Sequence, residues 1–135
     1  MTKESELEEL KKLVESKDLP LKKGATNLVF GEGNPNSQIV FIGEAPGFHE
    51  DRMGRPFVGN AGNLLNKTLL KAELKRDDVY ITNIVKDRPP GNRDPFPEEI
   101  DAYSLYLDRQ INIIQPKIIA TLGRFSMVYI INKFG

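Results

Sequence analysis

The stretch Gln38-Ile39-Val40-Phe41-Ile42-Gly43 and the glycine-rich loop that follows it, residues 44–62, decide the fold of this chain. A short, nearly continuous apolar run bounded by turn residues is typical of a strand buried on both faces of a parallel sheet. Two similar runs follow at residues 79–85 and 117–123. The sequence therefore predicts at least three parallel strands.

Helical patterns surround these runs, and they cover residues 4–17, 60–74, 97–114 and 124–133. Ser5 and Glu8 have the spacing of a capping box, and Pro97 suits the first position of a helix. We expect a turn at residues 31–36. The alternation of strands and helices predicts an α/β fold, in which a three-layer α-β-α arrangement surrounds an open parallel sheet. Ligands bind such sheets at the carboxyl ends of the strands.

The length and charge of the chain limit its class. Its 135 residues predict one domain over residues 1–135. Lys plus Arg and Asp plus Glu number 19 each, so the net charge is near zero. This balance excludes a protein held on nucleic acid by a global basic field, although a local basic groove is still allowed.

The sequence contains no cysteine. It therefore excludes disulfides, cysteine nucleophiles and any zinc site or iron–sulfur cluster held by thiolates of this chain. One histidine and scattered carboxylates give no familiar ligand spacing, so we expect no metal. The longest apolar runs fall far short of the roughly 18 residues of a membrane span, and the N-terminus has no signal-peptide pattern. We expect no membrane partner and a cytoplasmic location.

Two loops have unusual compositions. Residues 43–62 hold five of the 11 glycines. Glycines this close together let backbone amides approach a ligand. The alternative is that this loop is only a long connector with ordinary turns. Residues 86–97 hold four prolines together with Lys86, Arg88 and Arg93. This second loop could present cations to a ligand, or its basic residues could only pair with neighbouring aspartates.

Six motifs occur in order along residues 16–126: V-F-G-E-G-N-P from Val29, G-E-A-P-G from Gly43, G-R-P-F-V-G-x-A-G ending at Gly62, V-Y-I-T-N-I-V-K from Val79, R-P-P-G-N-R from Arg88 and L-G-R at Leu122. With these motifs the sequence closely resembles the family 4 uracil-DNA glycosylases, the iron–sulfur branch of the uracil-DNA glycosylase superfamily. The resemblance implies a monomer that flips uracil out of DNA and hydrolyses its N-glycosidic bond in base excision repair.

The resemblance also implies a base pocket. Backbone amides of Gly43, Ala45 and Gly47 would donate to a uracil carbonyl. Phe57 would stack on the flipped ring, although simple core packing is the alternative. Asn83 would accept from uracil N3–H and donate to O4, unless its amide only satisfies buried backbone groups.

Catalytic and DNA-binding roles follow from the same resemblance. Glu44 and Asn92 would hold the attacking water and stabilise the cationic sugar, and Glu50 is a second carboxylate for that water. Glu44 could instead cap a loop amide. The sole histidine, His49, is expected in solvent. The cations expected to bind DNA are Lys86, Arg88 and Arg93.

The sequence departs from the family at two places. Its four cluster cysteines align with Ser16, Leu19, Asp87 and Tyr103, so we expect no cluster, with Leu19 and Tyr103 filling the space and Ser16 and Asp87 hydrogen-bonded or facing water. Family members also continue to a histidine-containing loop beyond the position of Gly135. We therefore expect about the N-terminal two-thirds of the family fold, without its C-terminal part, and weak or no glycosylase activity.

Two other functions stay open. A non-catalytic nucleic-acid or base-binding module could keep the same pocket without the reaction. A flavodoxin-like nucleotide-binding domain is the weaker alternative, because the chain lacks a G-x-G-x-x-G fingerprint.

Overall fold

The computed structural model describes residues 1–134. Its helices and strands occur in the order α1 (Lys3–Ser16), β1 (Glu32–Gly33), β2 (Ile39–Gly43), α2 (Phe48–Met53), α3 (Asn60–Lys71), β3 (Tyr80–Asn83), α4 (Pro97–Ile114), β4 (Ile118–Thr121) and α5 (Arg124–Phe134). Short 3₁₀ turns lie at Lys22–Gly24, Arg76–Asp78 and Pro90–Asn92.

The four strands form one sheet in the order β1-β3-β2-β4. The β2 strand runs parallel to both β3 and β4, and Gly43 pairs with Asn83 at the carboxyl end of the β2–β3 ladder. This confirms the open sheet of three parallel strands. The two-residue β1 strand pairs antiparallel with β3 inside the segment expected to be a turn.

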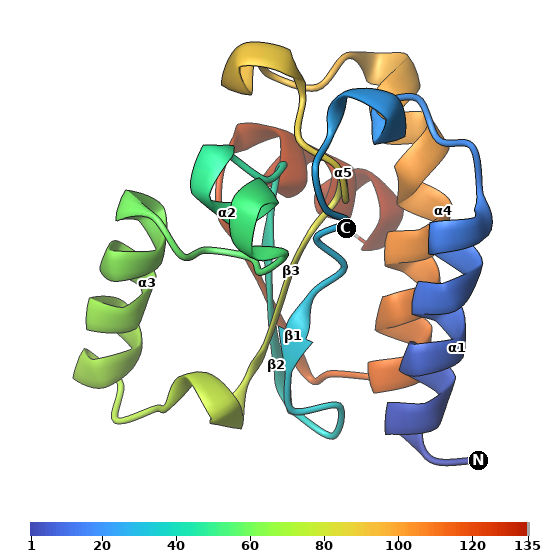
Figure 1. Cartoon of the computed structure of the whole chain (residues 1–135). Coiled ribbons are helices and arrows are strands. Elements are labelled where there is room, and N and C mark those ends of the chain that lie inside the picture. The colour runs from blue at the N-terminus through green and yellow to red at the C-terminus, as the bar shows by residue number, and fades with distance from the viewer. Residues whose placement is uncertain (135) are drawn as a thin grey trace.

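Helices cover both faces of the sheet, which confirms the three-layer α-β-α architecture. In Figure 1, α3 lies on one side of the sheet, while α1 and α4 run side by side on the other. The larger core cluster joins α1, α4 and part of α5 to β2 and β3. A smaller cluster under α3 contains Leu65, Leu69, Val79 and Ile81.

The chain order explains where a ligand site should form. The chain adds β3 on one side of β2 and then returns to add β4 on the other side. The order in which strands are added to the sheet therefore reverses at β2. The loops after β2, β3 and β4 therefore meet at one edge, the usual ligand-binding place of such sheets.

Local signals placed most helix ends well. The α4 helix has the predicted bounds, with Pro97 in its first turn, and α3 ends at Lys71, three residues before the predicted position. The capping box of α1 is formed by Thr2 and Ser5, so the expected pairing of Ser5 with Glu8 is wrong. The α2 helix lies in a loop for which no helix was predicted. None of the helices in residues 1–134 is long and apolar enough to cross a membrane.

Candidate active site

A glycine, an aromatic ring and a side-chain amide meet at the carboxyl ends of β2 and β3. A Cβ atom at Gly43 would lie 2.4 Å from Oδ1 of Asn83 and 2.4 Å from Cζ of Phe57. Gly43 and Asn83 are buried, and Phe57 is partly buried. The residues predicted to enclose a base therefore come together, and only glycine fits at the point where they meet.

The backbone of Phe57 is held in an unusual conformation. Its φ of 51° lies in the left-handed region, which is uncommon for a bulky residue and clusters at functional sites. Arg76 Nη1 donates to the Phe57 carbonyl at 2.9 Å. That carbonyl lies against α3 at Gly62, where a Cβ atom would be 2.0 Å from the oxygen. The Phe57 ring also packs on the cluster under α3, so it contributes to the core as well as facing Gly43.

A carboxylate fixes the arginine that holds Phe57. Glu32 accepts from Arg76 Nε at 3.2 Å and from two nitrogens of Arg55, at 2.8 and 2.7 Å. Hydrogen bonds from Arg55, with help from Arg76, hold the pKa of Glu32 below its usual value despite partial burial. The short β1 strand thus supports the backbone of Phe57 through Arg76.

Glu50 ties the glycine-rich loop together. Its carboxylate accepts from the N–H groups of Gly47 at 3.0 Å, Val58 at 2.9 Å and Gly59 at 2.8 Å. Burial alone would raise the pKa of Glu50, but these backbone hydrogen bonds outweigh burial and lower it. The expected positions of Gly47 and Glu50 need correction, because the Gly47 N–H donates to Glu50 instead of facing a ligand, and both Glu50 oxygens are engaged.

The N–H of Ala45 remains a candidate donor to a ligand. Within residues 1–134 it donates to no acceptor, whereas the carbonyl of Gly43 accepts from Ile84 and that of Glu44 accepts from Val85. Those two bonds continue the β2–β3 ladder and fix the path of the backbone that carries Ala45.

Glu44 reaches the third loop of this edge. Its Oε2 accepts from the Phe125 N–H at 2.6 Å, at the start of α5. Gly123 leaves the room for this contact, since a Cβ atom there would lie 2.7 Å from the Glu44 carboxyl carbon. The capping alternative for Glu44 is therefore what the structure shows, and the same carboxylate lies beside Gly43 in the chain.

Asn92 approaches the site from the proline-rich loop. The structure places it on the surface, where its Oδ1 accepts from Arg88 Nε at 2.7 Å. A Cβ atom at Gly47 would lie 2.9 Å from Glu50 Oε1 and 3.9 Å from Asn92 Nδ2. Asn92 thus lies near Glu50, and no hydrogen bond joins it to Glu44 in the described part of the chain.

The three predicted DNA-binding cations have different environments. Lys86 is fully buried, so the expectation that it faces DNA is wrong for this structure. Arg93 donates to both oxygens of Glu99, at 2.8 and 2.9 Å, and this pairing raises the pKa of Arg93. Arg88 lies with its guanidinium carbon 5.4 Å from the centre of the Phe48 ring. The alternative, in which these cations only pair with the side chains of Asp87 and Asp94, finds no support within residues 1–134, where no such ion pair is present.

His49 lies on the surface of α2, in contact with solvent as expected. It is exposed, and its ring contacts Phe48 edge-on with 5.4 Å between ring centres. Phe48 also stacks on Arg88, so the first turn of α2 and the proline-rich loop contact each other.

The four positions aligned with cluster cysteines do not fit an iron–sulfur cluster. Tyr103 is buried, and its hydroxyl donates to Asp87 and accepts from the Leu21 N–H. Leu19 packs on the same core cluster as Tyr103, and the Ser16 hydroxyl donates to the Leu13 carbonyl at 2.6 Å. Oxygen and carbon groups already engaged with protein neighbours supply none of the thiolates that such clusters require.

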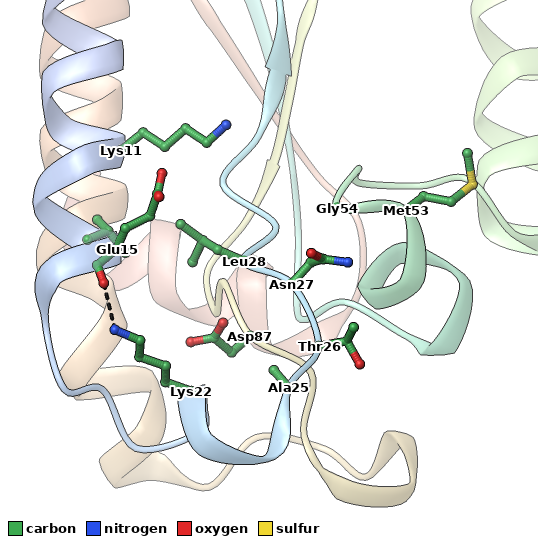
Figure 2. Close-up of a pocket in the computed structure, with 11 residues that line it drawn as sticks. Lys11, Glu15, Lys22, Ala25, Thr26, Asn27, Leu28, Met53, Gly54 and Asp87 are labelled. Carbon is green, nitrogen blue, oxygen red and sulfur yellow. Dashed lines mark hydrogen bonds between the residues drawn. The ribbon is translucent and has the colours of Figure 1, made fainter.

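Asp87 also faces a cleft. It lines a space of about 630 Å³ together with Lys22 and Thr26, between α1 and the loop before β1 (Figure 2). Burial, only partly offset by the Tyr103 hydrogen bond, raises the pKa of Asp87. Gly43, Phe57 and Asn83 do not line this cleft. The cleft beside Asp87, one of the positions aligned with a cluster cysteine, is therefore separate from the candidate base site.

Sequence reasoning missed the residues that support the site. Gly62 belongs to a glycine-rich motif, but its packing against the Phe57 carbonyl depends on how α3 docks. Arg76 and Glu32 stand 44 positions apart, and nothing in their neighbourhoods marks them as partners. The apolar run at residues 79–85 ends directly before Lys86, and this was a sign in the sequence that Lys86 adjoins a buried segment.

Comparison with known proteins gives the same assignment as the motifs. Residues 30–133 match the model of the uracil DNA glycosylase superfamily. The chain is 55% identical over 131 residues to a type-4 uracil-DNA glycosylase of Sulfurisphaera tokodaii, covering 96% of this chain and 60% of that protein. It is 49% identical over 125 residues to the type-4 enzyme of Archaeoglobus fulgidus, covering 93% and 63% of the two chains.

The chain covers a larger share of a third relative than of the first two. The type-4 uracil-DNA glycosylase of Pyrobaculum aerophilum is 44% identical over 131 residues, covering 96% of this chain and 67% of that protein. The chain thus spans about 60% of the length of the first two relatives. The chain belongs to the uracil DNA glycosylase superfamily.

Proposed function

We propose that this chain binds uracil flipped out of DNA and, as a uracil-DNA glycosylase, hydrolyses the N-glycosidic bond of that nucleotide. The observation that carries the proposal is the meeting of Gly43, Phe57 and Asn83 at one strand edge, in a chain of this superfamily. The proposal keeps the expectation of a monomer that acts on DNA in the cytoplasm.

Base recognition in this proposal depends on the pattern of donors and acceptors. Uracil offers N3–H as donor and O4 as acceptor, and a side-chain amide such as that of Asn83 complements both. Cytosine offers the opposite pattern at the same edge, so it is rejected as long as the amide keeps its orientation. The Phe57 ring would supply a stacking face, and the Ala45 N–H would donate to a carbonyl of the base.

Bond cleavage in this proposal needs a water and a negative charge near the sugar. Glu44 lies next to Gly43 in the chain and keeps a carboxylate at the strand edge, while Asn92 of the proline-rich loop and Glu50 of α2 both lie near Gly47. A carboxylate near an oxocarbenium-like centre lowers the barrier electrostatically. We propose Glu44 as that carboxylate and Asn92 as the ligand of the water, and we give Glu50 the task of shaping the loop.

The test uses the 135-residue chain and a fluorescent single-stranded oligonucleotide with one uracil. Fluorescence anisotropy compares its affinity with that for the matching thymine oligonucleotide, and alkaline strand scission detects abasic sites. Preference for uracil with scission above the background is the expected result. Replacing Phe57 by Ala removes one base-stacking contact worth about 1–3 kcal/mol, so we expect roughly fivefold to hundredfold weaker binding.

Controls separate base recognition from general effects. Asn83→Ala should abolish the preference for uracil, whereas Asn63→Ala changes an exposed asparagine of α3 and should leave it intact. Equal affinity of the unsubstituted chain for uracil and thymine, without scission, would refute the proposal.

A base-binding module without catalysis is the second candidate. The engagement of Glu44 with Phe125 and of Glu50 with three loop amides favours it, because neither carboxylate is free of protein partners. Preference for uracil without any scission, even at enzyme excess and long incubation, would select this reading.

A further inference from the structure

Lys86 is a buried cation without a carboxylate partner. It is fully excluded from solvent, and its Nζ donates to Oγ1 of Thr82 at 2.7 Å, to the carbonyl of Asn83 at 2.6 Å and to Oε1 of Gln110. Three acceptors match the three protons of an ammonium group. Within residues 1–134 no acidic side chain reaches it.

A second layer of bonds orients these acceptors. Gln110 Nε2 donates to the Phe30 carbonyl at 2.8 Å, which leaves the amide oxygen of Gln110 facing Lys86. The Thr82 hydroxyl donates to the same Phe30 carbonyl at 2.9 Å. The Phe30 ring lies 5.8 Å from Nζ and adds a cation–π contact. The Phe30 carbonyl therefore orients the Gln110 amide, whereas the Thr82 hydroxyl also lies 3.2 Å from Gln110 Oε1 and 3.5 Å from the Asn83 carbonyl.

Burying this amine is unfavourable in itself. Removal from water lowers the pKa of Lys86 well below its usual value, and a buried charge without a counter-ion destabilises a fold. Methionine has a similar length and could fill the same space without that cost. The three hydrogen bonds of the Lys86 amine therefore indicate a function that an apolar side chain could not perform.

The position of this hydrogen-bond network in the fold indicates the function of Lys86. Two of the three acceptors, Thr82 and Asn83, are the last residues of β3, and the Asn83 side chain faces Gly43 and Phe57. Within residues 1–134 no hydrogen bond of the Asn83 side-chain amide is found, and no fully buried side-chain polar atom lacks a partner, so the amide atoms keep some access to solvent and no bond at the amide itself fixes its direction. Beyond the sheet ladder, the carbonyl of Asn83 accepts from Lys86 Nζ at 2.6 Å and, at the longer distance of 3.5 Å, from the Thr82 hydroxyl.

We propose that Lys86 is a positioning residue for base selection: it anchors the carbonyl of Asn83 from inside the protein and so fixes the direction in which the Asn83 amide faces the base. This inference rests on the proposed function for its effect on DNA. Its effect on Asn83 is independent of DNA and is measured separately.

The first variant is Lys86→Met, with Lys67→Met on the exposed face of α3 as the matched control. In metal sites, removal of the groups that orient the ligands changes affinity or activity by about 10–100-fold, and we expect a comparable effect of Lys86 on Asn83. We expect at least a tenfold loss in the ratio of uracil to thymine affinity for Lys86→Met, measured well below its unfolding temperature, and no change for Lys67→Met.

Thr82 provides variants that do not remove the buried amine. Thr82→Val deletes one acceptor at nearly constant volume, and Thr82→Ser keeps the hydroxyl. We expect Thr82→Val to lower the uracil preference and Thr82→Ser to retain it. If Lys86→Met does not fold, this pair decides the question, because equal preference in both folded variants would overturn the inference.

A spectroscopic readout separates this inference from the proposed function. NMR of the free protein follows the side-chain NH₂ signals of Asn83, and we expect changed shifts and faster hydrogen exchange in Lys86→Met and Thr82→Val. Unchanged signals in either folded variant would overturn the inference. If the unsubstituted chain does not prefer uracil, the proposed function fails, while the Asn83 signals still decide the role of Lys86.

Discussion

At the scale of single residues, Gly62 controls the aromatic wall of the site. A Cβ atom at this position would lie 2.0 Å from the oxygen and 2.4 Å from the carbon of the Phe57 carbonyl, and backbone atoms cannot move aside as a flexible side chain can. We expect Gly62→Ala to reduce the free energy of unfolding by about 1–3 kcal/mol, the usual effect of overpacking, and to weaken uracil binding. Urea unfolding measures the first effect.

Gly24 is the matched control for that substitution. A Cβ atom there would have nothing within 4 Å, so Gly24→Ala should leave the stability nearly unchanged or raise it slightly. If both variants unfold at the same urea concentration as the parent chain, α3 does not constrain Phe57 in the way described.

The lowered pKa of Glu50 predicts how the free energy of unfolding responds to acid. Its pKa is lowered in the folded chain, and in the unfolded chain it returns to the usual value of 4.5. The ionised carboxylate therefore stabilises the fold above that usual value, and its contribution disappears as the pH falls through the lowered pKa. Urea unfolding of Glu50→Gln should show a clear deficit at neutral pH that shrinks as the pH falls below 4.5 and through the lowered pKa of Glu50. A deficit that stays constant with pH would mean that the charge of Glu50 has no part in holding the loop.

Base-site residues and the buried lysine differ in how far the sequence could predict them. Phe57, Asn83 and the glycine loop were predictable because motifs mark them and because the carboxyl ends of parallel strands meet. Lys86 was expected on the surface because lysine rarely lies fully buried. Its acceptor Gln110 stands 24 positions away on α4, so the environment that holds the ammonium exists only after that helix has packed.

At the scale of elements, a buried hydrogen-bond pair joins three segments of the chain. Tyr103 on α4 donates to Asp87 after β3 and accepts from the N–H of Leu21 after α1. Tyr103→Phe would leave both partners buried without that hydrogen bond, which typically costs about 1–3 kcal/mol. We expect a loss of this size in the free energy of unfolding.

Tyr106 on the same helix supplies the control. It is buried, and its hydroxyl forms no hydrogen bond within the described residues, so Tyr106→Phe should change the stability much less. Equal losses in Tyr103→Phe and Tyr106→Phe would show that the hydroxyl of Tyr103 does not tie these segments together.

Elements with long, regular patterns were predicted, and short ones were not. The bounds of α4 follow from Pro97, the acidic residues after it and an apolar stripe over five turns. The α2 helix has six residues in a glycine-rich loop, too few for a periodic signal. The β1 strand has only Glu32 and Gly33, and it exists because the edge of β3 is available for pairing.

At the scale of the whole molecule, the parallel sheet and its layers of helices were predictable from the alternation of strands and helices, whereas the order of the strands and the charge distribution were not. The net charge is near zero, a local basic groove was left possible, and three cations of one loop were expected to bind DNA. Burial removes Lys86 from that surface, and Glu99 neutralises Arg93. Of the three, Arg88 remains available to a phosphate, since its described partners are an amide oxygen and an aromatic ring.

This distribution predicts a shallow salt dependence of binding. Each phosphate neutralised on single-stranded DNA contributes about −0.7 to the slope of log K against log salt concentration, so a few contacts give a slope of only about −1 to −2. Arg88→Gln should reduce the slope by roughly 0.7 and weaken binding equally for uracil and thymine oligonucleotides. Arg93→Gln should instead lower stability and leave the slope unchanged, because its charge is already paired with Glu99. Titrations at several salt concentrations distinguish the two, and a steep slope that neither substitution alters would place the DNA on a different face of the molecule from the proline-rich loop.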